Sequence, residues 1–261
     1  ATINPLVKAL DRDIVRAVLY RHRDADLAAR AAKSIHDHVA ASRMRGGKRI
    51  PYDFSMRASE TGSLSCSSLV RLAFEQASGG AFVLPTYPTR IAKKNRDFLD
   101  RVGIATETTF APADIDIESS FDLVAEWQDY RETANIRLQD FTVDKLFEWM
   151  DRYNYRFEET SAIKLVSALG RFSSHFSENA KHVLSSAFPR VPPNMPRRTV
   201  AAIAMLHKTA EPIYHELQHL NQQVVIETGV PMHGVDILDA LDAIRARHGN
   251  RIGYLVRRGF E

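Results

Sequence analysis

The chain has 261 residues, 44% of them hydrophobic and 26% charged, which are the proportions of a globular protein with room for a real core. The formal net charge is only +3 without a long basic run, so composition argues against a nucleic-acid-binding protein. The single cysteine excludes an internal disulfide, and the sequence has neither an apolar run of membrane-spanning length nor a signal-peptide pattern at its start.

The first part of the chain predicts helices and a strand in alternation. Residues 3–12 carry apolar side chains at helical spacing, and residues 14–20 are typical of a β-strand. The alanine-rich run over 24–41 keeps its larger apolar residues in helical register, which predicts a helix that ends before Gly46-Gly47. The sequence therefore begins with mixed secondary structure.

A second helix is predicted over residues 66–78. Hydroxyl side chains that can cap a helix stand directly before Cys66, and apolar residues recur at 69/70, 73/74 and 77, the spacing of one helical face. Gly79-Gly80 ends the segment. Cys66 is therefore expected in the first turn of this helix.

The pattern changes near residue 135. Before it, residues 85–100 predict an irregular loop with a short helix, and residues 121–127 predict a short strand. After it, long helical patterns dominate, at 142–154, 158–172, 175–187, 199–226 and 234–248. We therefore expect an α+β fold with two parts, a mixed part over 1–135 and a mainly helical part over 136–261.

Cys66 is the candidate nucleophile. The unpaired N–H groups and the positive dipole end at the start of a helix favour a thiolate over a thiol, and the thiolate is the reactive form. The plainer interpretation is that a lone cysteine fills space in the core. The sequence around Cys66 bears on the choice between them.

Pro51-Tyr52-Asp53-Phe54 and Cys66-Ser67-Ser68-Leu69-Val70 together resemble the paired motifs of the permuted papain-like cysteine hydrolases, in the YiiX/YaeF-like branch of the NlpC superfamily. In that family a Tyr-Asp pair lies a short way upstream of a Cys-Ser-x-Leu-Val helix start that supplies the nucleophile. The resemblance covers about residues 14–130, and it implies a circularly permuted papain-like fold for the first part of the chain.

The resemblance implies acyl transfer through an acyl-enzyme on Cys66, with no cofactor, on a small peptide or on a lipid-type or peptidoglycan-type acyl substrate. Tyr52, Asp53 and Ser65 are expected to shape the substrate pocket or the turn beside the nucleophile. The family places its base histidine on strands before the cysteine, in a Gly-His motif that residues 1–65 lack. An upstream segment or a second chain could carry this histidine. The histidines that do precede Cys66 are His22, His36 and His38.

A rival motif lies at His215-Glu216-Leu217-Gln218-His219, which matches HExxH, the pattern of two zinc-binding histidines and a water-activating glutamate. Pro212 is expected to bend this helix or to start it afresh. His215 and His219 lie opposite the apolar seam of the helix, where a solvated face would look the same. The third zinc ligand has several candidates, none at a diagnostic spacing: Glu227, His233, Asp236 and Asp239.

Three functions therefore remain open from sequence: a cysteine hydrolase or acyltransferase, a zinc hydrolase that uses His215 and His219, and a non-catalytic binding module on a papain-like fold. The basic pairs Arg197-Arg198 and Arg257-Arg258 are expected to be solvated.

Overall fold

The computed structural model describes residues 3, 5, 14–44, 50–57, 62–160 and 195–259. Helices make up 58% and strands 13% of the structure, so the predicted α+β class is confirmed. The permuted papain-like arrangement stays a prediction. The helices expected over 3–12, 158–172 and 175–187 lie almost entirely outside the described residues.

The chain divides into two compact units. The first comprises Ala1–Lys93 and Ile104–Tyr130, and the second comprises Lys94–Gly103 and Arg131–Glu261. This division differs from the expected boundary at 135 in two ways. It falls a few residues earlier, and the second unit also takes up the short segment 94–103.

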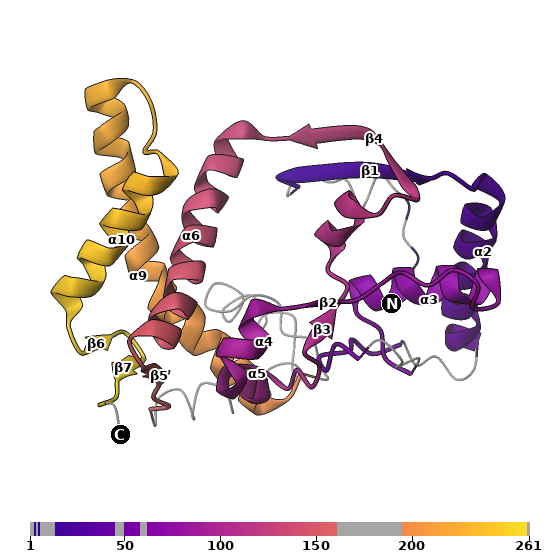
Figure 1. Ribbon diagram of the computed structural model, residues 1–261, viewed down its shortest axis with the longest axis horizontal. Coiled ribbons are helices and arrows are strands. Elements are labelled where there is room, and N and C mark those ends of the chain that lie inside the picture. The colour runs from indigo at the N-terminus through magenta and orange to yellow at the C-terminus, as the bar shows by residue number, and fades with distance from the viewer. Residues whose placement is uncertain are drawn as a thin grey trace. The chain divides into compact units, whose positions relative to one another are not determined.

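A two-stranded antiparallel sheet belongs to the first unit (Figure 1). Strand β1 (Arg16–His22) pairs with β4 (Phe121–Gln128), so that His22 lies opposite Phe121 and the register shifts once, after Leu19. Both strands were predicted, and β1 extends two residues further than expected, to His22. The pairing brings the two ends of the first unit together.

Helix α2 (Ala25–Met44) packs against α3 (Cys66–Ser78) in the same unit. The Asp24 carboxylate accepts a hydrogen bond from the Leu27 N–H at 2.8 Å, which is the cap that starts α2. Gly79 ends α3 with φ of 64°, a left-handed conformation that glycine adopts without steric cost. The larger of two buried clusters between these helices comprises Leu27, Ala31, Ala73, Phe74, Leu84 and Phe110.

Short elements complete this unit. Strand β2 (Tyr87–Pro88) pairs with β3 (Thr108–Thr109), and the 3-10 helix η1 (Pro112–Ile117) precedes β4. Helix α4 (Arg90–Lys94) leads out of the unit, and its last residue belongs to the second one. The segment 85–100, expected to hold an irregular loop and a short helix, therefore contains β2, α4 and the start of one further helix.

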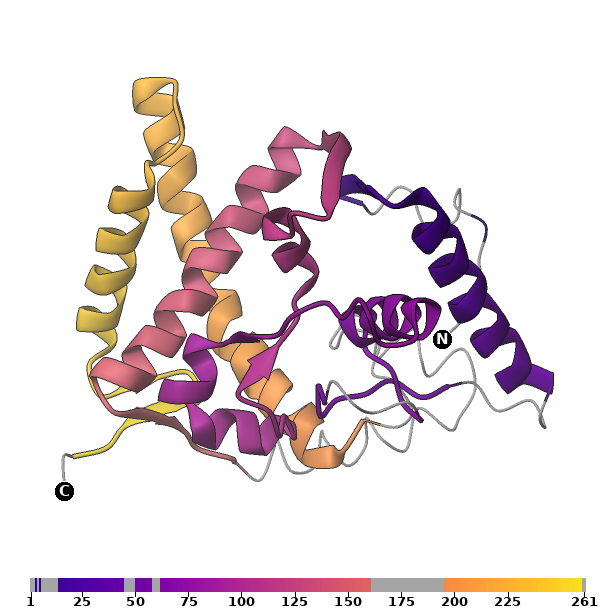
Figure 2. The same cartoon turned by 45° about the vertical axis from the view of Figure 1, so that its right-hand side comes forward.

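The described residues of the second unit form the helices α5 (Arg96–Val102), α6 (Tyr130–Arg152), α9 (Arg197–Thr228) and α10 (Gly234–His248). Helix α10 packs along α9 (Figure 2). Within residues 14–44, 50–57, 62–160 and 195–259, none of the helices combines the length and the hydropathy that a membrane crossing requires. Helix α6 begins twelve residues earlier than the helix predicted over 142–154.

A small sheet follows the helices, in the order β5-β7-β6. Strand β5 (Tyr155–Phe157) pairs antiparallel with β7 (Leu255–Arg257), which also pairs with β6 (Arg251–Ile252). Gly253 makes the turn between β6 and β7 at φ of 54°, where an added Cβ would lie only 3.1 Å from the backbone of Thr209 on α9. Only glycine allows this close approach.

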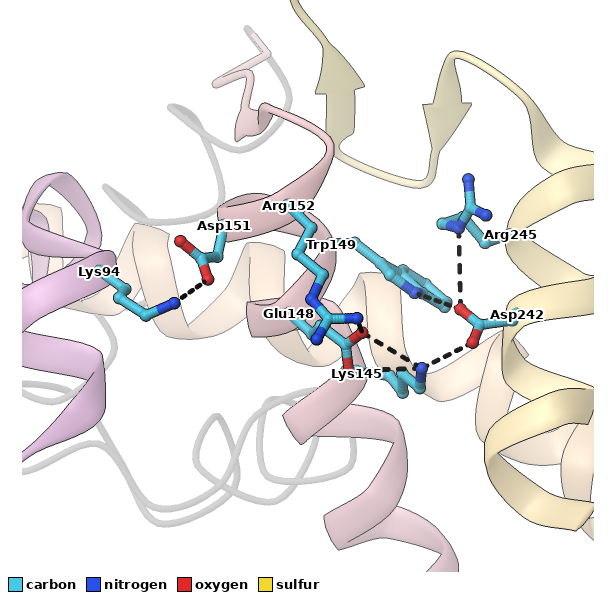
Figure 3. Close-up of polar contacts among 8 residues, drawn as sticks. All are labelled: Lys94, Lys145, Glu148, Trp149, Asp151, Arg152, Asp242 and Arg245. Carbon is cyan, nitrogen blue, oxygen red and sulfur yellow. Dashed lines mark hydrogen bonds and ion pairs between the residues drawn. The ribbon is translucent and has the colours of Figure 1, made fainter. Parts of the chain in front are cut away.

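A buried lysine links α6 to α10 (Figure 3). The Lys145 side chain is 7% exposed, and its ammonium lies 2.7 Å from an Asp242 carboxylate oxygen and 3.3 Å from one of Glu148. The Trp149 indole N–H donates to the other Asp242 oxygen at 3.4 Å. A charge taken out of water needs such partners, so this network joins the two helices by an ion pair inside the unit.

Candidate active site

The start of α3 is held by a reciprocal cap. The Ser68 N–H donates to the Ser65 hydroxyl oxygen at 3.2 Å, and the Ser65 N–H donates to the Ser68 hydroxyl oxygen at 2.7 Å. Serine therefore stands where a capping box usually has Glu or Gln. Ser65 was expected to line the substrate pocket; its side chain is buried and its hydroxyl caps the helix.

Cys66 is the first residue of α3, as predicted, and its free thiol is exposed. It is therefore not the core filler that the plainer interpretation of a lone cysteine expects. Among the described residues, the backbone N–H groups of Cys66 and Ser67 have no hydrogen-bond acceptor, because the cap uses only the next N–H, that of Ser68. Two free N–H donors thus lie in the same turn as the sulfur.

Tyr52 reaches Cys66 from a separate segment. The Leu64 N–H donates to the Pro51 carbonyl at 3.1 Å, which ties the two segments together next to α3. The pKa of the Tyr52 phenol is raised, first by burial and then by the neighbouring Cys66 sulfur, so the two side chains lie near each other. Tyr52 therefore stays protonated at neutral pH and can donate to the sulfur.

Asp53 is buried, and its side chain stabilises the loop in which it lies. Its carboxylate accepts from the Ser55 N–H at 2.8 Å, from the Ser55 hydroxyl at 2.6 Å and from the Arg57 N–H at 3.1 Å. This is the Asx-type turn that short polar side chains favour. Asp53 therefore shapes the turn that carries Tyr52, one of the two roles expected of it.

Removing the helix cap at Ser65 should destabilise the protein. Ser65→Ala should lower the free energy of unfolding by about 1 kcal/mol, because it removes the acceptor of the Ser68 N–H at a helix start. Ser67→Ala is the matched control, since the Ser67 hydroxyl only approaches the Ser65 hydroxyl at 3.4 Å and caps no N–H. Urea unfolding of the full chain measures both. Equal losses in the two variants would contradict a specific cap.

His22 does not lie beside Cys66. Its ring is buried and contacts Phe74, Phe82 and Phe121 at centroid distances of 5.1, 5.0 and 5.0 Å. Phe74 is eight residues beyond Cys66 on α3, which corresponds to about 12 Å along the helix axis. The imidazole is thus an aromatic core residue, with Nδ1 hydrogen-bonded to the backbone of Asp24 and Nε2 without a partner among the described residues.

The other two upstream histidines lie on α2. The His36 ring is exposed, and its Nδ1 lies 3.3 Å from a carboxylate oxygen of Asp37. His38 is half-buried on the same helix. Within the described part of the chain neither contacts Cys66, so none of the three upstream histidines is placed as its base.

The HExxH segment lies inside α9, which runs unbroken through Pro212, so the expected restart of the helix there is wrong. His215 and His219 are exposed, as predicted from the seam, while Leu217 is buried. Glu216 is ion-paired with Arg247. Within the described ranges, no group of three His, Cys, Asp or Glu side chains is arranged to hold a metal ion.

Comparison with known proteins identifies no relative: no family model, curated protein or solved structure matches this chain. The resemblance to papain-like hydrolases therefore rests on the motifs around Tyr52 and Cys66 alone. What sequence analysis missed is the effect of the Cys66 sulfur on the phenol of Tyr52 and the role of Ser68 in the cap. The three-residue spacing of Ser65 and Ser68 could have indicated the cap.

Proposed function

We propose that the protein is a cysteine hydrolase or acyltransferase in which Cys66 attacks the carbonyl of an amide or ester. The observation that carries the proposal is the position of the sulfur. It is exposed at the first residue of a capped helix, with the Tyr52 side chain near enough for the sulfur to raise the pKa of the phenol. A cysteine that only fills space has none of these features.

The reaction proceeds in two steps. The Cys66 thiolate attacks the carbonyl carbon, and the oxyanion that forms accepts hydrogen bonds from backbone N–H groups of the first turn of α3, each worth on the order of 3 kcal/mol when well placed. The C–N or C–O bond then breaks, and the amine or alcohol leaves with a proton from a general acid. Water, or another acceptor, attacks the acyl-enzyme and regenerates the thiol.

Tyr52 acts on the sulfur in this scheme. A neutral phenol donates a hydrogen bond to a thiolate, and it remains neutral well above pH 7 because burial and the neighbouring sulfur raise its pKa. In the proposed reaction this hydrogen bond stabilises the negative charge on the attacking sulfur. Asp53 contributes by holding the loop on which Tyr52 stands.

The general base is a histidine in the family that the motifs resemble. Of the ten histidines in the chain, eight lie within the described residues, and none of these eight contacts Cys66 there. His175 and His182 lie outside those residues. Single alanine substitutions at all ten positions identify the base if this chain carries it; if turnover survives every one, an upstream segment or a second chain supplies it.

The reactivity of the Cys66 thiol toward an alkylating reagent tests the proposal. At pH 6 to 7, well below the usual cysteine pKa of about 8.5, iodoacetamide should alkylate Cys66 at least about tenfold faster than it alkylates free cysteine. Tyr52→Phe should slow the labelling roughly threefold to tenfold, since the thiolate loses a donor. Intact mass and peptide mapping follow the reaction. A Cys66 that stays inert from pH 6 to 8 would contradict the hydrolase and favour a non-catalytic binding module.

A further inference from the structure

A hollow that does not include Cys66 lies within the second unit. It has a volume of about 310 Å³, at the lower end of the range for small-molecule pockets. The guanidinium-bearing residues Arg101, Arg156 and Arg258 line it, and we call it the arginine hollow. Its apolar lining comes from three buried side chains, those of Phe98, Met150 and Phe157.

The backbone of each arginine is anchored. Arg101 is in the last turn of α5, where the Thr199 hydroxyl on α9 donates to the Val102 carbonyl at 2.6 Å. Arg156 stands in the middle of β5. The Arg258 N–H donates to the Asn154 carbonyl at 3.1 Å, just beyond the end of β7. Three separate segments thus hold the three side chains around one hollow.

The charges in the hollow are poorly compensated. Arg156 donates to the backbone carbonyls of Met150 and Tyr155, at 2.8 and 3.0 Å, and its Nε lies 3.7 Å from a carboxylate oxygen of Asp97. Within the described ranges, the side chains of Arg101 and Arg258 form no ion pair. Three cations therefore face one carboxylate, which is a local excess of two positive charges.

We propose that the arginine hollow binds a phosphate monoester that carries a small apolar or aromatic group. Guanidinium groups match the geometry of phosphate oxygens, and a phosphate dianion would offset the excess of two charges. The hollow is larger than a phosphate group needs, and Phe98 and Phe157 offer apolar surface to the remainder of the ligand. This inference does not depend on the proposed chemistry of Cys66.

Arg258 belongs to a pair that the sequence predicts to be solvated. Both residues are exposed, as predicted, and of the two only Arg258 lines the hollow. Arg257 therefore offers a matched control, since Arg257→Gln removes the same charge one residue away.

Titration calorimetry of the full chain with phenyl phosphate tests the inference. We expect a Kd of about 1 mM or tighter, weakened by added salt. Arg101→Gln and Arg258→Gln should each weaken binding about tenfold, Arg257→Gln should leave it within twofold, and Asp97→Asn should strengthen it about threefold, because the competing carboxylate is gone.

Three results would overturn the inference. The first is no heat of binding at phenyl phosphate concentrations up to about 20-fold above the expected Kd. The others are an equal loss of affinity in Arg257→Gln and Arg258→Gln, and benzoate binding as tightly as phenyl phosphate. The first result would mean that the hollow binds no such ligand. The second would mean that binding depends only on the general surface charge, and the third that the ligand is a carboxylate and not a phosphate. Inorganic phosphate, titrated in parallel, should bind more weakly than phenyl phosphate because it leaves the apolar lining uncovered. Equal affinity would likewise contradict the aromatic part of the proposal.

Discussion

Cys66→Ala should abolish acyl transfer, with a loss on the order of 10³-fold or more in the rate of ester or amide cleavage, because the remaining nucleophiles of the first turn of α3, the hydroxyls of Ser67 and Ser68, react far more slowly than a thiolate. With an activated p-nitrophenyl ester as substrate, the unsubstituted protein should show a burst of nitrophenolate and a mass increase equal to one acyl group on the Cys66 peptide. Both signals should be absent in the variant.

The substitution is a clean test because the Cys66 side chain is exposed. Replacing it should change the free energy of unfolding by no more than about 0.5 kcal/mol, so a loss of activity cannot be ascribed to unfolding. Ser67→Ala, which alters the next residue of the same turn, should retain the burst. If Cys66→Ala hydrolysed the ester at the unsubstituted rate, the nucleophile would lie elsewhere. Zinc analysis of that variant would then test His215 and His219.

Asp242→Ala should destabilise the second unit by about 2–3 kcal/mol. The Lys145 ammonium, 7% exposed, would keep only the Glu148 carboxylate at 3.3 Å, and the Trp149 indole would lose its acceptor. Removing one member of a buried ion pair generally costs about 3–5 kcal/mol, and the 40% exposure of Asp242 reduces that value. Urea unfolding monitored by tryptophan fluorescence measures the loss.

Lys145→Met supplies the decisive contrast. It removes the buried charge and keeps most of the apolar volume, so the expected loss is within about 1 kcal/mol, and combining it with Asp242→Ala should recover most of the stability that Asp242→Ala loses. Lys94→Met is the surface control, because the Lys94–Asp151 pair is more exposed and should contribute less than about 1 kcal/mol. Equal losses for Asp242→Ala and Lys145→Met would mean that the network stabilises by packing alone.

Elements with local signals at both ends were predicted well. Helix α3 begins after Ser65 and ends at Gly79, and α10 keeps the predicted limits of 234–248. The early part of α6 was missed because it buries little: before residue 140 only Leu138 is buried, so the apolar periodicity is absent, although no proline or glycine interrupts the helix. Strands β5, β6 and β7 have two or three residues each, too few to show alternation.

The sequence by itself determined the setting of Cys66, because a cap, a helical face and a terminating glycine are all interactions within a few residues. Tertiary structure alone decided that Tyr52 lies near the sulfur while His22 packs away from it, and that Arg101, Arg156 and Arg258 share one hollow. Periodicity and capping report which face of an element is buried and where it ends. They do not report which distant side chains meet, because that depends on how separate elements pack.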